Sequence, residues 1–270
     1  MNIKISIMRK LIIILLLFII TILYGCSNGD ESINIKDYRQ PLTRAQIDEI
    51  ITTATESIIV DVDYSQITKP DPVQQTEINE RMRYLGEQLK GKVTIENTNI
   101  VVARVNGETV TASDWYWKKV NNTVQAEFNN KSIPSDAEIL KDLIKTKVIS
   151  NTARSLGIYP PEDQIKAYIA DQQKIMEILK PEEIIILIQA WGISEEEYYL
   201  IMEDRFTDSL AKTNWGVYLE KYEHEGQEDK QGYVAKSFSW IGDDKLKPLL
   251  EKAKVEITSE GRKLGISYKN

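Results

Sequence analysis

The sequence has 270 residues and a formal net charge of −7, with 42% hydrophobic and 28% charged residues. This composition predicts one large folded domain or two small ones, and the acidic balance disfavours nucleic acid and anionic membrane surfaces as partners. The single cysteine and the single histidine exclude an intramolecular disulfide, a thiolate metal cluster, a CxxC redox site and an HExxH zinc site. We therefore expect no metal and no cofactor.

Residues 1–25 have the pattern of a secretory signal. Three basic residues precede an apolar run from Leu11 to Ile22, and no acidic residue occurs before Asp30. A basic start, an apolar stretch and a small residue just before the cleavage point are typical of such a signal. The apolar run is shorter than the roughly 20 residues that a membrane-spanning helix needs.

The stretch Leu23-Tyr24-Gly25-Cys26 resembles the lipobox of bacterial lipoproteins. In that class the signal is cut before the cysteine, whose sulfur carries a diacylglycerol. The resemblance implies that Cys26 is lipidated and that the protein is anchored at the extracytoplasmic face of the cell membrane. The alternative is an uncleaved anchor helix with an incidental cysteine. Without the leader the net charge falls to −10, so stable attachment has to come from two or three acyl chains and not from a basic patch.

Residues 26–40 are polar and predict a tether between the membrane and the folded body. Residues 41–98 form an N-terminal helical segment. Its first helix is capped by Thr43 and runs to about Ile59, and its second runs from Val73 to Lys90. The sequence leaves open whether these helices pack on the rest of the chain or form a small separate unit.

The pattern then changes to short β-branched runs. Val93–Glu96 and Ile100–Val105 predict strands, and Glu108–Thr111 predicts the returning strand of a hairpin. Asn106-Gly107 between the last two is the strongest two-residue hairpin signal.

A series of helices follows the hairpin. Thr111 or Ser113 caps the first, which places Trp115 and Trp117 on opposite sides, so that one is a candidate for the core and the other for the surface. The later helices are expected at Asp136–Leu156, from Pro160-Pro161 to Leu179, at Pro181–Trp191, and from the Ser194–Glu197 capping box to about Tyr222. The chain closes with a helix at Asp244–Ala253 and a strand at Lys254–Ile257.

The order of these motifs resembles the N-terminal chaperone region of the SurA and PrsA foldases, which is related in helical design to the trigger-factor C-terminal domain. That family has an A-x-V-N-G-x-x-I-T hairpin, a helix with L-I-x-x-K-L-L-x-x-x-A-x-x-x-G-I, and a G-x-S-x-E-E-Y/F cap. The matching segments here are Val102–Thr111, Leu143–Val148, Ala153–Ile158 and Trp191–Tyr198. The similarity spans roughly Ile100 to Glu220.

The resemblance implies a mainly α (α+β) fold. Residues 99–222 would form the SurA-like helical core, and residues 241–270 would complete it, with a small antiparallel sheet made by the hairpin and the C-terminal strand. Family members commonly insert a parvulin prolyl-isomerase domain of about a hundred residues, the size of an ordinary small domain. Here residues 223–240 form only a charged linker with His224, whereas parvulin sites use a pair of histidines. We therefore expect that the protein has no isomerase activity and is not an enzyme.

A chaperone of this kind needs an adaptable apolar surface on its helices. The candidate peptide-binding residues are Met176, Ile185, Leu187, Trp191, Tyr198, Tyr199 and Met202. The alternative is that the apolar helix over 181–191 is buried on all sides. The expected function is a lipid-anchored extracytoplasmic chaperone that binds unfolded or nascent secreted polypeptides without catalysis. The alternatives are a scaffold lipoprotein with one dedicated envelope or sporulation partner and a protein related to peptidyl-prolyl isomerases.

Overall fold

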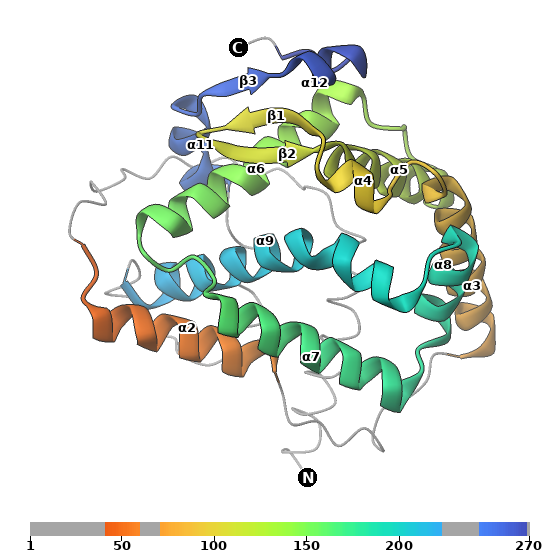
Figure 1. Ribbon diagram of the computed structural model, residues 1–270, viewed down its shortest axis with the longest axis horizontal. Coiled ribbons are helices and arrows are strands. Elements are labelled where there is room, and N and C mark those ends of the chain that lie inside the picture. Colours follow the sequence, from red (N-terminus) through yellow and green to blue (C-terminus); the bar gives the residue numbers. More distant parts are fainter. Residues whose placement is uncertain (1–40, 60–70, 223–242, 269–270) are drawn as a thin grey trace.

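The computed structural model describes residues 41–59, 71–222 and 243–268 (Figure 1). The fold is mainly α-helical with a small three-stranded antiparallel sheet, which confirms the fold class expected from the sequence. The elements are α2 Arg44–Ile58, α3 Pro72–Leu89, α4 Ile95–Thr98, β1 Val101–Val105, β2 Glu108–Thr111, α5 Ala112–Phe128, α6 Asp136–Ser155, α7 Glu162–Leu179, α8 Glu182–Trp191, α9 Glu195–Tyr222, α11 Asp243–Glu251, β3 Val255–Ile257 and α12 Ser259–Lys263. The leader, Cys26, the tether and the linker with His224 lie outside the described residues.

Short polar side chains cap several of the helices, close to where the sequence predicted their starts. The Oγ1 of Thr43 caps α2, and Ser194 and Glu197 form reciprocal hydrogen bonds at the start of α9. At α5 the cap is Thr111, whose hydroxyl accepts from the Asp114 N–H while Asp114 accepts from the Thr111 N–H. These bonds satisfy backbone groups that would otherwise have no partner in the first turn.

The sheet has the order β2-β1-β3, so the C-terminal strand pairs with the hairpin as expected. Asn106 and Gly107 both have positive φ, 52° and 93°, as a two-residue hairpin turn requires. The turn also holds β3, because the Asn106 N–H donates to the Lys254 carbonyl at 2.9 Å and the Lys254 N–H donates to Oδ1 of Asn106 at 2.8 Å. Figure 1 shows α12 packed beside β1 and β3.

The prediction of a strand at Val93–Glu96 is wrong. Val93 is fully buried, and the short helix α4 begins directly after Thr94, whose side chain caps it. The Val93 carbonyl accepts a hydrogen bond from Nε1 of Trp191 at 3.0 Å. Val93 is therefore apolar because its side chain lies in the same hydrophobic cluster as Trp191, and not because it pairs in a sheet.

The described residues form two hydrophobic clusters, and α9 contributes to both. Figure 1 shows α9 crossing the middle of the molecule. The first surrounds the sheet, α2, α6 and the C-terminal half of α9. The second lies among α3, α5, α8 and the N-terminal half of α9. Trp115 belongs to the first cluster and Trp117 to the second, and they are 1% and 9% exposed. Both are therefore core residues, because the helix that carries them is covered on two sides.

The two N-terminal helices pack on the rest of the molecule. α2 contributes Ile50 and Ala54 to the first cluster, and α3 contributes Leu85 and Leu89 to the second. The contact between α3 and α8 is especially close at Gly86, where an added Cβ would lie 2.6 Å from the Leu187 carbonyl oxygen. These helices are thus part of the same core and not a separate unit.

Candidate polypeptide-binding surface

The structure divides the seven residues predicted to bind peptide. Leu187, Trp191, Tyr198, Tyr199 and Met202 are buried in the second cluster, and none of them is more than 8% exposed. Met176 on α7 and Ile185 on α8 are half-buried. Only these two of the predicted residues therefore reach the surface.

Aromatic packing explains why most of these residues are buried. The ring centroid of Trp191 lies 5.5 Å from that of Trp117 and 6.5 Å from that of Tyr198. Tyr198 in turn meets Tyr199 edge-on at 5.4 Å. Helix α3 closes over α8 from the other side, and its position could not be read from the sequence.

Helix α7 has a different relation to the core. Figure 1 shows it with α2 along one edge of the molecule, while α9 crosses the middle. Its only fully buried side chains are Gln164 and Gln172. Gln164 anchors the start of the helix, because its Nε2 lies 3.1 Å from both Oδ1 of Asn214 on α9 and Oγ1 of Thr55 on α2.

The apolar side chains of α7 all remain partly accessible to solvent. Tyr168 contacts Phe206 of α9 edge-on, but even this residue is only half-buried. Towards the end of the helix Ile178 is 50% exposed. We define the α7–α8 surface as the accessible apolar side chains on either side of the turn between the two helices, namely Ile175, Met176, Ile178, Leu179, Ile185 and Ile186.

Sequence reasoning identified two members of this surface and missed four. A signal was nevertheless present, because residues 175, 176, 178 and 179 are all apolar. Successive residues of an α-helix are about 100° apart, so four apolar residues in five positions cannot all face one neighbouring helix. The excess side chain is Ile178, which the structure places outward.

The segment that carries this surface is acidic. The segment 171–200 contains seven acidic and two basic residues, a net charge of −5. Glu177, Glu182 and Glu195 are exposed, and the hydroxyl of Tyr199 is buried without a hydrogen-bond partner. Burial raises the pKa of that hydroxyl, and the charges of Glu195 and Glu177 raise it further.

A second polar feature lies inside the molecule, where α5, α6 and α9 meet. We call it the charged junction and define it as Asp114, Lys147, Arg205 and Asp208 with the hydroxyls of Ser113 and Ser150. Nζ of Lys147 lies 2.6 Å from Oδ2 of Asp208 and 3.9 Å from Oδ2 of Asp114. Ser150 donates to Oδ1 of Asp208 at 2.7 Å, and Arg205 donates to Ser113 at 2.9 Å.

The charges of the junction compensate one another. Burial lowers the pKa of Lys147, but the carboxylates of Asp208 and Asp114 outweigh that effect and raise it overall. Burial raises the pKa of Asp208, with Lys147 opposing the change. We conclude that the lysine stays protonated and that the junction is a network of mutually compensating charges.

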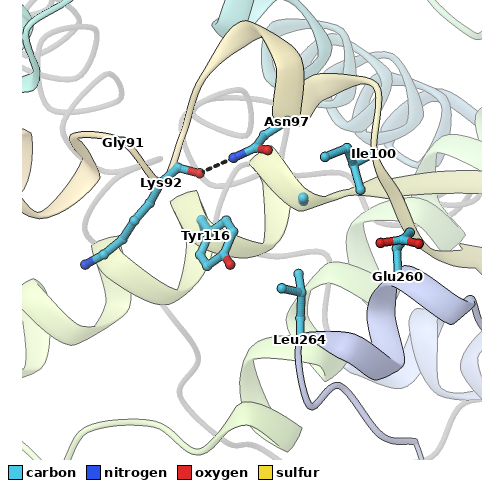
Figure 2. Close-up of a pocket in the computed structure, with 8 residues that line it drawn as sticks. Gly91, Lys92, Asn97, Ile100, Tyr116, Glu260 and Leu264 are labelled. Atoms are coloured by element: carbon cyan, nitrogen blue, oxygen red, sulfur yellow. Dashed lines mark hydrogen bonds between the residues drawn. The ribbon is translucent and has the colours of Figure 1, made fainter.

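Two shallow pockets lie at the sheet end of the molecule, with volumes of about 190 and 240 Å³. Figure 2 shows the first, where Ile100, Tyr116 and Leu264 line the cavity and Asn97 donates to the Lys92 carbonyl at 2.7 Å. Both are smaller than the roughly 300–1,000 Å³ of ordinary small-molecule sites. Neither is therefore a candidate substrate site.

The described residues supply no group of three or more His, Cys, Asp or Glu side chains placed to hold a metal ion. None of the helices in the described ranges has the length and hydropathy to cross a bilayer. In comparisons with known proteins, the chain matches no family model, no curated protein and no solved structure.

Proposed function

We propose that the protein is a lipid-anchored extracytoplasmic chaperone that binds unfolded or nascent secreted polypeptides at the α7–α8 surface without catalysing a reaction. The observation that carries this proposal is the accessibility of the apolar face of α7. Six apolar side chains around one helix–helix turn remain partly exposed, and Ile178 is half-exposed. Apolar side chains that stay accessible to solvent can mark sites that bind other polypeptides.

The type of side chain supports binding of many sequences. Isoleucine, leucine and methionine offer apolar contact without fixed hydrogen-bond geometry, and methionine adapts its shape readily. The α7–α8 surface consists only of these three residue types. A site of this composition discriminates weakly between partners, as a chaperone requires.

The anchor and the location rest on the leader and the lipobox resemblance at Cys26. The chaperone role is also supported by the resemblance of residues 100–220 to the SurA and PrsA foldases. The proposal excludes isomerase activity because the short linker with its single histidine would have to replace a whole domain.

The proposal is tested by light scattering from an unfolded client in the presence of the full-length protein. At stoichiometric amounts we expect the wild type to slow aggregation and Ile178→Ser to be less effective. Ile133→Ser is the matched control, because Ile133 is also an exposed isoleucine but lies in the loop before α6. Failure of the wild type to slow aggregation would contradict the chaperone function.

Affinity purification from solubilised membranes separates this function from that of a scaffold. A chaperone should retain many polypeptides weakly. A single dominant partner in a stoichiometric amount would favour the scaffold.

A further inference from the structure

Strand β3 forms one edge of the sheet. The order β2-β1-β3 leaves it with no neighbouring strand on its outer side among the described elements, and Figure 1 shows it at the rim of the molecule. The backbone of Lys254 faces β1, because its carbonyl accepts from the Asn106 N–H at 2.9 Å. Since the backbone groups of successive residues alternate in an antiparallel ladder, the N–H and carbonyl groups of Val255 and Ile257 face outward.

The part of this edge that can accept a partner is short and is centred on Val255. At one end Nη1 of Arg262 donates to the Ile257 carbonyl at 2.6 Å. At the other end the Ala253 N–H donates to the Leu250 carbonyl at 3.1 Å. Between these two bonds, no backbone group of the described ranges bonds to the outward N–H or carbonyl of Val255. A further strand can therefore pair only over residues 253–257.

The side chains of this edge complement an antiparallel copy of themselves. Lys254 and Glu256 are exposed and lie on one face of β3, whereas Val255 and Ile257 lie on the other face and pack against the first cluster. When two β3 strands pair antiparallel about Val255, Lys254 of each copy lies directly opposite Glu256 of the other. Opposite charges at such positions stabilise a strand pair and like charges destabilise it.

The backbone groups favour the same register. The two Val255 residues would exchange both of their hydrogen bonds, and each Ile257 N–H would face the Ala253 carbonyl of the second copy. The Ala253 N–H and the Ile257 carbonyl, which already have partners, would face each other, so that no existing bond has to break. Moving the centre by one residue would instead place Lys254 opposite Lys254 or Glu256 opposite Glu256.

We propose that β3 is a self-association edge, at which a second copy of this chain pairs antiparallel about Val255 and the two three-stranded sheets join into one. A lysine on an edge strand ordinarily discourages pairing, but the glutamate two residues later offsets it when the partner is the same sequence reversed. The contact is limited to one short strand, so the dimer is reversible. Self-pairing does not depend on the proposed chaperone function, because the α7–α8 surface lies on other elements.

The test measures sedimentation equilibrium of the full-length protein in density-matched detergent micelles over a range of concentrations. We expect the wild type to show a monomer–dimer equilibrium. Lys254→Glu should weaken the dimer by about 5- to 100-fold, because two cross-strand pairs change from opposite to like charge. Lys254→Glu/Glu256→Lys reverses both charges and should regain most of the affinity. Lys131→Glu makes the same charge change in the loop before α6 and should have no effect.

A backbone variant tests the hydrogen bonds. Val255→Pro removes an N–H that faces away from β1, and proline is tolerated on the outer side of an edge strand. We expect it to abolish the dimer while the far-ultraviolet circular dichroism of the protein stays unchanged.

Disulfide cross-linking tests the register. A mixture of Lys254→Cys and Glu256→Cys copies should cross-link on mild oxidation, because directly opposed residues of this kind have Cα atoms about 4.5 Å apart. Either variant alone should cross-link poorly, since its two cysteines would be about 8 Å apart along the diagonal. The wild type, whose only cysteine is Cys26, is the control.

Three results would overturn self-pairing at β3. They are a monomer at every concentration, a dimer that Lys254→Glu and Val255→Pro leave intact, and cross-linking of either cysteine variant alone as readily as of the mixture. A monomer in which Val255→Pro impairs the suppression of client aggregation would place a client strand at this edge instead of a second copy. None of these results bears on whether the wild type slows aggregation, so the chaperone function stands or falls separately.

Discussion

The charged junction and the α7–α8 surface reverse the usual distribution of side chains in opposite ways. At the junction four charged residues are largely buried between α5, α6 and α9. At the α7–α8 surface six apolar residues remain accessible. One region places charge where the dielectric constant is low, and the other leaves apolar area in water.

The buried charges of the junction restrict how the helices can pack, whereas the accessible apolar side chains permit alternative contacts. A buried charge has few acceptable partners, so Lys147 and Asp208 fix how α6 and α9 meet. An apolar contact has no directional requirement, so the residues of α7 can exchange one apolar neighbour for another. We infer that the junction fixes how α5, α6 and α9 meet, whereas the proposed binding surface can accept different apolar neighbours.

The largest effect is expected from Lys147→Met, which breaks the junction. The variant leaves the Asp208 carboxylate buried with Ser150 but without its ammonium partner at 2.6 Å. Removing one member of a buried pair costs about 3–5 kcal/mol, which we expect as the loss in free energy of unfolding by urea.

The double variant Lys147→Met/Asp208→Leu is the control for this prediction. It replaces both charges by apolar groups and should regain most of the lost stability. A loss below about 1 kcal/mol in the single variant, the range of an exposed ion pair, would contradict burial of the junction.

The second-largest loss of stability is expected at the contact between α3 and α8, which buries one side of α8. Gly86→Ala places a methyl group 2.6 Å from the Leu187 carbonyl oxygen and 2.8 Å from the Trp191 nitrogen, both backbone atoms. The helices must separate, and overpacking of this kind costs about 1–3 kcal/mol. We expect a lower melting temperature and a red shift of tryptophan emission as Trp191 gains solvent, whereas Glu80→Ala on the exposed side of α3 should show neither.

The parts of this comparison differ in how far the sequence predicts them. Helix starts at Thr43 and Ser194 and the turn at Asn106-Gly107 depend on neighbours within four residues, so their patterns were sufficient. For α5 the pattern left Thr111 and Ser113 open as caps, and the structure shows that Thr111 is the cap. The helix α12 was missed because it has only five residues and packs through Gly261 against β1, where an added Cβ would lie 2.1 Å from the Val102 carbonyl oxygen. That contact is not visible in the local sequence.

The sequence could not predict which apolar side chains are buried in the second cluster. Apolar residues such as Leu187 and Tyr198 fit a core and a binding surface equally well by type. The deciding fact is that α3, about a hundred residues earlier in the chain, covers α8. In the same way, Lys147 and Asp208 are 61 residues apart and neither has a distinctive sequence context.

The hydroxyl of Tyr199 is buried without a hydrogen-bond partner, unlike the paired charged groups of the junction. Tyr199→Phe removes a buried hydroxyl that has no partner, so we expect the free energy of unfolding at pH 7 to stay equal or rise by up to about 1 kcal/mol. A loss of more than that amount would show that the hydroxyl is hydrogen-bonded in the folded protein.

The pH dependence of this variant has a defined sign. Burial holds the pKa of Tyr199 above its ordinary value of 10, so on alkaline titration the unfolded chain releases this proton first. The contribution of the group to stability is therefore complete below the pKa of the unfolded chain, about 10, and is lost as the pH rises above it. Urea unfolding at neutral and alkaline pH should show a smaller alkaline loss in Tyr199→Phe than in the wild type.

The smallest effect on stability is expected from Ile178→Ser. Because the side chain is 50% exposed, its replacement should change the free energy of unfolding by no more than about 0.5 kcal/mol. Leu187→Ala on α8 is the comparison, since truncating a buried leucine costs about 2–5 kcal/mol. If Ile178→Ser destabilised the protein as much as Leu187→Ala, α7 would be an ordinary core helix. A near-neutral change combined with weaker suppression of client aggregation would instead show that this apolar side chain serves binding and not folding.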